Sequence, residues 1–309
     1  YFEAYNNLMS LFERTNQNEK LKETITKAEK QFKFHPVVKL YYGFYLFKTQ
    51  KYLEAIKNLE EIKFNKKEFN REMLRSLILA KCYDQEDSIE KAFYYFKKTN
   101  ETDLNHKNKE IDKNKTLKIV KDRKNFFKNP EIKKWPIIKS DDLNENPIFL
   151  VGFNRSGTTL LDNILGSHPS IEVIEEKPIV GNFITSLSEK INNNFQNLKN
   201  IDEINLKRFR KIYFDNKEKY INNKDNSKIY IDKMPLNIIH VAEIVRIFPN
   251  AKFIVTFRHP YDCVLSCFMQ NFKLNNANAN FLDLVDAANF YNSVMGLWTQ
   301  YTKNFSVNY

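Results

Sequence analysis

The stretch from Pro147 to Leu161 constrains the fold of this chain more than any other part of the sequence. It begins with the apolar run Ile148–Val151, continues through a turn that contains Gly152 and Gly157, and leads into a predicted helix. Glycines let a backbone approach an anion closely, and the first N–H groups of a helix point at such a ligand. The sequence therefore predicts an anion-binding loop at the end of a buried parallel strand.

This loop differs from the Walker A sequence of P-loop proteins, G-x-x-x-x-G-K-[ST]. The spacing of Gly152, Gly157 and the following threonines agrees, but Thr158 stands where the motif requires lysine. The positive charge lies inside the loop instead, at Arg155. We therefore expect an anion other than an ordinary magnesium–nucleoside triphosphate complex, and a P-loop small-molecule kinase is the weaker alternative.

Composition narrows the class of protein. The 309 residues are 42% hydrophobic, which fits about two globular domains, and their net charge of +11 is explained more simply by solvated lysines than by an anionic partner. No nucleic-acid-binding motif stands out. The cysteines, Cys82, Cys263 and Cys267, have no metal-ligand spacing, and no apolar run reaches the ~18–20 residues that span a membrane. We expect a cytoplasmic protein in a reducing compartment.

Residues 1–100 are predicted to form amphipathic helices with an internal repeat. Tyr42-Gly43 and Ala55 correspond to Leu79-Ala80 and Ala92, at an offset of 37 residues, and an older repeat precedes them. The pattern resembles tetratricopeptide repeats. Two interpretations remain open: a concave surface that binds a peptide or protein, or a helical stack that shields the catalytic domain or supports a homodimer.

Residues 101–146 are predicted to form a linker with one connecting helix. Glu101–Thr116 is polar and highly charged, the apolar positions of Leu117–Phe127 suit a helix, and Asp141–Asn146 belongs to a second loop. We therefore place the domain boundary here.

From residue 147 to 309 the pattern predicts an α/β domain with a mostly parallel sheet. Strands are expected at 148–151, 171–174, 229–231 and 252–257, with helices at 158–166, from 183 to about 220, at 238–248 and after residue 262. A charged residue follows each strand, and ligands bind at the carboxyl ends of such strands. These charged residues are Arg155, the pair Glu175-Glu176, Lys233 and Arg258.

Two arginines at separate strand ends suit a ligand with two separated anionic groups. Arg155 would hold one group with the loop, and Arg258 with Ser266 would hold the other. Glu176 is better placed as a general base than as an anion ligand, and Lys233 could stabilise charge on a leaving oxygen. Nothing in this set of residues demands a metal.

Three blocks carry a family resemblance. Residues 152–159 (Gly-x-x-Arg-Ser-Gly-Thr-Thr), 232–235 (Asp-Lys-x-Pro) and 258–266 (Arg-x-Pro-x-Asp-x-x-x-Ser) resemble the signature of sulfotransferases that use 3′-phosphoadenosine 5′-phosphosulfate (PAPS). The run 155–176 is most similar to the branch with protein-tyrosine sulfotransferases and bacterial tetratricopeptide-repeat sulfotransferases. The resemblance covers residues 147–309.

The resemblance implies direct, in-line, metal-free transfer of a sulfuryl group from PAPS to a hydroxyl acceptor. It implies that Glu176 deprotonates the acceptor and that Lys233 supports the sulfuryl group and the leaving phosphate. Arg258 and Ser266 would bind the 3′-phosphate. The 5′-phosphosulfate would be bound by the loop residues Arg155, Ser156, Gly157, Thr158 and Thr159.

The chain also departs from the family pattern. Asn154 stands where Pro is usual, and the adjoining Glu175 leaves the base assignment open. The family usually continues beyond a helix like Asn289–Tyr301, so we expect the domain to be C-terminally incomplete at Tyr309. The acceptor stays open among a protein tyrosine, a carbohydrate, a lipid head group and a small alcohol. A non-catalytic repeat scaffold with a vestigial nucleotide site is the alternative from another class of function.

Overall fold

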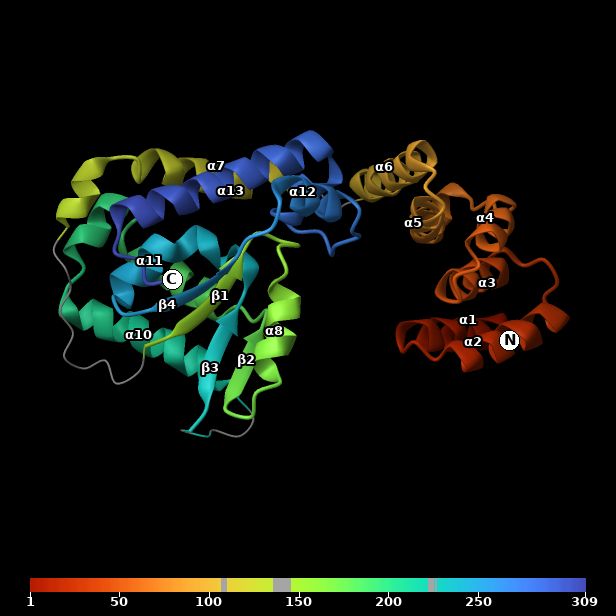
Figure 1. Ribbon diagram of the computed structural model, residues 1–309, viewed down its shortest axis with the longest axis horizontal. Helices are drawn as coiled ribbons and strands as arrows, with labels where there is room; N and C mark the ends of the chain where they lie inside the picture. The colour runs from red at the N-terminus through yellow and green to blue at the C-terminus, as the bar shows by residue number, and fades with distance from the viewer. Residues whose placement is uncertain (107–109, 136–145, 222–224, 226) are drawn as a thin grey trace. The chain divides into compact units, whose positions relative to one another are not determined.

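The computed structural model describes residues 1–106, 110–135, 146–221, 225 and 227–309 of the chain (Figure 1). They form two compact units. The first unit comprises Tyr1–Asp112 and Phe268–Asp283, and the second comprises Lys113–Cys267 and Leu284–Tyr309. The domain limits expected from the sequence stay a prediction. The return of a later segment, Phe268–Asp283, to the first unit had no signal in the sequence.

Between residues 1 and 106 the first unit consists of six α-helices that pack in succession, each pair forming a helical hairpin (Figure 1). The hydrophobic core of the first hairpin includes Met9, Leu21 and Ile25. The all-helical character expected for this region is confirmed. The helices are α1 (Phe2–Arg14), α2 (Asn18–Gln31), α3 (Pro36–Lys48), α4 (Tyr52–Glu60), α5 (Phe69–Gln85) and α6 (Ile89–His106).

The small residues singled out in the repeat lie at close helix contacts. A Cβ atom on Gly43 would lie 2.4 Å from Cδ2 of Leu59, so α3 approaches α4 only because this residue is glycine. Ala55 and Ala92 are both buried. The assignment of these hairpins to tetratricopeptide repeats stays a prediction.

The predicted linker contains more helix than its polar composition suggested. Helix α6 continues to His106, and α7 begins at Lys113 and ends at Phe126. Thr99 and Asn100 near the end of α6 are buried, and the Asn100 amide donates a hydrogen bond to the carbonyl of Phe268, 3.0 Å away. Tertiary contacts thus extend the helix beyond its apolar part. The loop predicted over 141–145 lies outside the described residues.

The second unit contains a four-stranded parallel sheet with the order β2-β3-β1-β4. Its strands are β1 (Ile148–Gly152), β2 (Ile171–Glu175), β3 (Ile229–Lys233) and β4 (Lys252–Thr256). The predicted α/β class, with strands at these four places, is confirmed. Parallel pairing brings the carboxyl ends of the strands to one edge, so the loops after Gly152, Glu175, Lys233 and Thr256 lie together.

Helices and short 3-10 turns connect these strands. Cys263 and Cys267 on helix α12 (Pro260–Phe268) are buried free thiols. The elements are η2 (Pro130–Lys134), α8 (Thr158–Gly166), α9 (Ile179–Lys190), η3 (Phe195–Asn200), α10 (Glu203–Glu218), η4 (Pro235–His240), α11 (Val241–Ile247), α12 (Pro260–Phe268) and α13 (Leu284–Asn304), with η1 (Lys66–Glu68) and η5 (Asn278–Leu282) in the first unit.

The single helix predicted from 183 to about 220 was wrong. The chain forms α9, η3 and α10 instead, because Asn192 and Asn193 adopt left-handed backbone angles of 52° and 55° that end α9. Asp202 then starts α10 by accepting a hydrogen bond from the N–H of Asn205. The helix predicted at 238–248 likewise begins as the 3-10 turn η4.

Over the described residues, no helix is both long and apolar enough to cross a membrane.

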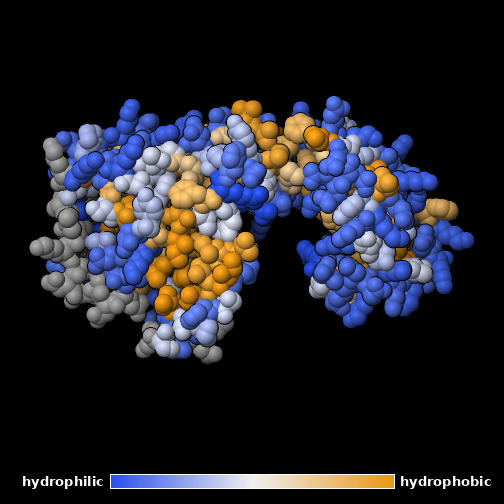
Figure 2. Space-filling view, viewed as in Figure 1, coloured by the Kyte–Doolittle hydropathy of each residue, from blue (hydrophilic) through white to orange (hydrophobic). Residues whose placement is uncertain are grey.

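Figure 2 shows apolar residues gathered over the strands and α8 of the second unit. Leu160 and Ile164 on α8 are exposed apolar side chains.

Candidate active site

The loop after β1 is fixed to the end of β4 by close packing. A Cβ atom on Gly152 would lie 2.5 Å from Oγ1 of Thr256 and 2.7 Å from Oγ of Ser156, so only glycine fits there. The Ser156 hydroxyl donates to the carbonyl of Phe153 at 2.7 Å, and its oxygen lies 2.6 Å from that of Thr256. Since Ser156 has one proton to donate, Thr256 is the donor in the second bond. Ser156 thus shapes the loop.

The backbone of the loop leaves N–H groups open for an anion. Arg155 has a φ of 65° and Gly157, the N-cap of α8, a φ of 101°. No atom lies within 4 Å of a Cβ built on Gly157, so the loop is open there. Among the described residues, no acceptor contacts the N–H of Thr158 or Thr159; the first helical bond runs from Leu161 to Gly157. These free donors and the positive end of α8 attract an anion.

The two sequence blocks predicted to bind separate anionic groups meet at the loop. Nε of Arg155 donates to Oγ of Ser266 on α12 at 3.0 Å. Arg258 lies nearby, with Nη1 3.5 Å from the carbonyl oxygen of Arg155 and Nε 3.4 Å from Oδ2 of Asp262. Arg155 and Arg258 are both exposed, so their remaining donors face solvent and are available to a ligand.

Lys233, the last residue of β3, is completely buried and holds a cluster of carboxylates. Its Nζ lies 2.8 Å from Oε1 of Glu175, 3.0 Å from Oε1 of Glu176 and 3.6 Å from Oδ2 of Asp162 on α8. The ammonium has three protons, and three carboxylates surround it. Glu175 and Lys233 are register partners of adjacent parallel strands, which places both on the same face of the sheet.

The carboxylates set the charge state of the cluster. Burial by itself lowers the pKa of Lys233, but hydrogen bonds from its ammonium to Glu175 and Glu176 outweigh burial and raise that pKa. Burial raises the pKa of Asp162 against the opposing attraction of Lys233. Lys233 is therefore charged at neutral pH.

The backbone of Glu176 is strained. Its φ is 50°, in the left-handed region that a residue with a long side chain rarely adopts, while its N–H donates to the carbonyl of Lys233 at 2.8 Å. This turn directs the Glu176 side chain back to Lys233, although regular alternation along β2 would send it to the other face of the sheet. Glu175 and Glu176 are 57% and 55% exposed, so both reach solvent.

Asp232, next to Lys233 in the Asp-Lys-x-Pro block, lies on the opposite face of the sheet. It is buried, the Tyr213 hydroxyl donates to its Oδ2 at 3.4 Å, and its Oδ1 has no partner among the described residues. Burial raises the pKa of Asp232 to about 7. The block therefore places one residue in the site and one in the core.

The structure thus brings the predicted residues into two groups, Arg155 with Ser266 and Arg258, and Lys233 with Glu175 and Glu176. Ser156 and Thr158 are buried, whereas Thr159 is exposed at the first turn of α8. Sequence reasoning missed Asp162 and Thr256. Asp162 lies one helical turn after Thr158, but a single Asp on a predicted helix carries no signal without knowledge of the strand beneath it.

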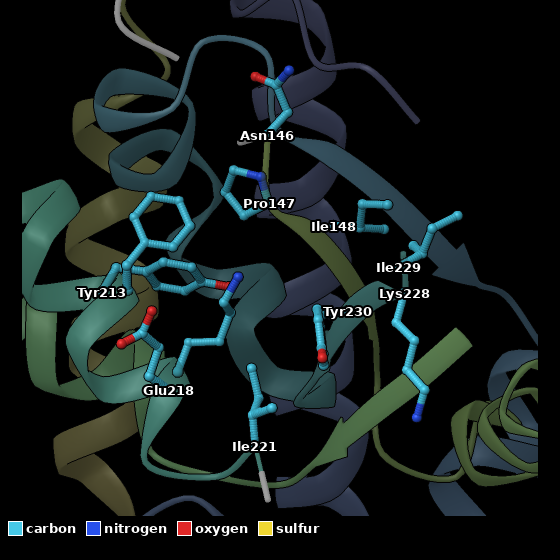
Figure 3. Close-up of a pocket in the computed structure, with 11 residues that line it drawn as sticks. Asn146, Pro147, Ile148, Tyr213, Glu218, Ile221, Lys228, Ile229 and Tyr230 are labelled. Atoms are coloured by element: carbon cyan, nitrogen blue, oxygen red, sulfur yellow. The ribbon is translucent and has the colours of Figure 1, made fainter. Parts of the chain in front are cut away.

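Other features lie away from these groups. A cavity of about 290 Å³ opens at the amino ends of β1 and β3, beside Pro147 and Tyr230, the opposite end of the strands from the loop (Figure 3). Within the described ranges, no group of three His, Cys, Asp or Glu side chains is arranged to hold a metal ion. Metal-free chemistry stays a prediction.

Comparison with known proteins agrees with this arrangement. Residues 147–306 match the model of the Sulfotransferase family. The match covers more than half of the chain, so the chain belongs to the Sulfotransferase family. An uncharacterized protein from Aquifex aeolicus (strain VF5) is 32% identical over 145 residues, which are 45% of this chain and 19% of that protein. The chain thus spans only a small part of this relative's length.

Proposed function

We propose that this chain transfers a sulfuryl group from PAPS to a hydroxyl acceptor. One observation carries the proposal: a charged Lys233 with two solvent-facing glutamates and a loop with Arg155 follow adjacent strands at the same sheet edge. A base, a cation for the leaving group and a cradle for an anion are the parts that this transfer requires.

The residues present fit the donor. The open N–H groups at Thr158 and Thr159, with Arg155, suit its 5′-phosphosulfate. Arg258 and Ser266 suit its 3′-phosphate, and the hydrogen bond between Arg155 and Ser266 places the two binding groups side by side. The role proposed for Ser156 is to shape the loop through Phe153 and Thr256.

The chemistry assigned to the chain is proton transfer and charge stabilisation. Glu176 accepts the proton of the acceptor hydroxyl while the acceptor oxygen forms its bond to sulfur. Lys233 donates a hydrogen bond to the phosphate oxygen that leaves as its bond to sulfur breaks. The donor supplies the activated sulfuryl group, and the products are a sulfate ester and 3′-phosphoadenosine 5′-phosphate. Transfer is direct, so positioning supplies most of the rate.

For the acceptor we propose only a broad class, molecules with a hydroxyl group. The helical hairpins of the first unit suit a peptide or protein acceptor, or a homodimer contact. Carbohydrate, lipid and small-alcohol hydroxyls are equally compatible with Glu176. A screen with PAPS labelled in its sulfate group, on tyrosine peptides, oligosaccharides, lipids and small alcohols, distinguishes these acceptors.

Thermal denaturation with 3′-phosphoadenosine 5′-phosphate tests the proposal before any acceptor is known. We expect the bisphosphate to raise the melting temperature of the wild-type protein, since a ligand that binds only the folded state stabilises it. The Arg155→Ala variant should lose this protection. Lys252→Ala, which removes an exposed lysine from the start of β4, is the matched control and should keep it.

The outcomes separate the alternatives. Equal protection by ATP with magnesium and none by the bisphosphate would contradict the proposal and favour a kinase. Protection by the bisphosphate without transfer to any acceptor class would favour the non-catalytic scaffold.

A further inference from the structure

We propose that Asp162 is a positioning residue that holds the Lys233 ammonium in place while Glu176 turns to the acceptor. The proposal rests on the proposed function, because it concerns the lysine of that same site. It starts from the surroundings of the Lys233 ammonium, which forms ion pairs with Glu175, Glu176 and Asp162.

The three carboxylates differ in their freedom to move. Glu175 and Glu176 are more than half exposed and have long side chains, whereas Asp162 is 13% exposed and has a short one. Glu176 must leave Lys233, at least in part, to take a proton from an acceptor. A lysine proton must also become free for the leaving oxygen. Asp162 is the carboxylate that stays, since its short and largely buried side chain has fewer conformations to adopt than the glutamates have.

The place of Asp162 in the fold gives this contact a further consequence. It lies on α8, four residues after Thr158. Helix α8 directly follows the loop of residues 153–157 that is predicted to bind an anion (the anion loop). Helix α8 packs on β1 and β2, and Lys233 ends β3 between them in the sheet. The ion pair between Asp162 and Lys233 therefore joins the anion loop to the lysine through one turn of rigid helix, which fixes the distance between cradle and ammonium.

The chain must also keep the ammonium charged at the moment of proton transfer. When Glu176 accepts a proton it becomes neutral, and Lys233 loses one of its two closest counter-ions. Asp162 and Glu175 then remain. A buried ammonium without enough counter-charge is costly, so the third carboxylate stabilises the state in which transfer occurs.

The test compares Asp162→Asn with Asp162→Glu, and uses Asp215→Asn as the matched control. Asp215 forms an exposed ion pair with Lys211 on α10, 3.0 Å apart, so the control removes the same charge from a carboxylate outside the Lys233 cluster. With PAPS and an acceptor found in the screen, we expect Asp162→Asn to lower kcat by about tenfold to a hundredfold with little change in the KM for PAPS. Asp162→Glu should restore part of kcat, and Asp215→Asn should match the wild type.

A second readout does not need activity. The ammonium of a buried, hydrogen-bonded lysine exchanges its protons slowly enough to give a ¹H–¹⁵N correlation signal, and loss of the signal in Lys233→Met assigns it. We expect Asp162→Asn to shift or broaden this signal, with and without 3′-phosphoadenosine 5′-phosphate, while Asp215→Asn leaves it unchanged.

The two readouts separate the possible failures. A wild-type protein that neither binds the bisphosphate nor transfers sulfate contradicts the proposed function, and the lysine signal still decides whether Asp162 holds Lys233. An Asp162→Asn variant with wild-type kcat and an unchanged lysine signal would overturn the positioning role.

Discussion

The hydroxyl oxygens of Ser156 and Thr256 lie 2.6 Å apart, so a single hydrogen bond ties the anion loop to the end of β4. These residues are a hundred positions apart in the sequence: Ser156 lies in the loop after β1, and Thr256 ends β4, the strand that pairs with β1. The bond explains why a serine in the loop is buried, although the arginine and glycine beside it are exposed.

Ser156→Ala is expected to reduce the free energy of unfolding by about 1–3 kcal/mol, because it removes the hydroxyl that donates to the Phe153 carbonyl and accepts from the Thr256 hydroxyl. Affinity for 3′-phosphoadenosine 5′-phosphate should fall only slightly, because Ser156 shapes the loop and does not itself contact the ligand. Urea denaturation and calorimetric titration measure the two effects. Ser170→Ala, an exposed serine before β2, is the control and should behave as wild type. A large loss of affinity at unchanged stability would instead make Ser156 a direct ligand of the donor.

Gly152→Ala is expected to cost about 1–3 kcal/mol of stability and to abolish protection by the bisphosphate. The new methyl group would lie 2.5 Å from Oγ1 of Thr256, so the loop or the end of β4 must move. Gly181→Ala is the matched control: Gly181 lies in α9, and a Cβ there meets no atom within 4 Å. Because alanine favours a helix over glycine by about 0.5–1 kcal/mol, this control should be slightly stabilised. Equal denaturation midpoints for both variants would refute the close contact at Gly152.

The sequence predicted this sheet because each strand is a short apolar run followed by a glycine or charged residue. It predicted the loop of Arg155 and the positions of Lys233 and Arg258 for the same reason, since parallel topology fixes which ends meet. It did not predict the pairing of Lys233 with Asp162, because that contact depends on how α8 packs on the sheet. The long helix expected after residue 183 was wrong because paired asparagines, polar and thus compatible with an exposed helix face, adopt left-handed angles that end α9.

Replacement of each glutamate by glutamine should identify the base. Both carboxylates contact Lys233, but the Glu176 side chain reaches it through a strained backbone. Such strain costs free energy and is found mainly at functional sites, so it favours Glu176 as the base. We expect Glu176→Gln to lower kcat by about 10²–10⁴-fold and Glu175→Gln by much less, with bisphosphate protection kept in both. Labelled-sulfate transfer under saturating PAPS measures the difference. The reverse order of losses would assign the base to Glu175.

Asp232→Asn is expected to stabilise the protein at pH 8 and to have little effect near pH 4. Burial raises the pKa of Asp232 to about 7 in the folded state, whereas the unfolded carboxyl ionises near pH 4. Between these values the folded state holds a proton that the unfolded state has lost, so wild-type stability falls as pH rises, by about 4 kcal/mol at most. The amide does not titrate and removes this loss. Urea denaturation from pH 4 to 8 measures the slope, and parallel curves for both proteins would show that Asp232 is ionised in the fold at pH 7.

The buried ion pair of Arg123 and Glu243 in the second unit should contribute to stability in a way that depends on pH. Nη2 of Arg123 lies 2.6 Å from Oε1 of Glu243, both side chains are less than a tenth exposed, and His240 Nδ1 lies 3.6 Å from the same carboxylate. Burial alone raises the pKa of Glu243, but the Arg123 guanidinium and a hydrogen bond with His240 bring it down to about 2. Because the folded pKa is depressed, the stability from this group is present above about pH 4.5 and is lost as pH falls toward 2.

Arg123→Leu is therefore expected to reduce the free energy of unfolding at pH 7 by about 3–5 kcal/mol, since it leaves the Glu243 charge buried without its partner. The double variant Arg123→Leu with Glu243→Leu should recover part of this loss because no charge is left unpaired. Lys211→Leu, which breaks the exposed pair with Asp215, should change stability by less than about 1 kcal/mol. Urea denaturation of the four proteins at pH 7 and pH 3 checks the set. The gap between wild type and Arg123→Leu should narrow at pH 3, where the unpaired Glu243 of the variant is protonated; an unchanged gap would mean that packing, and not charge, stabilises this contact.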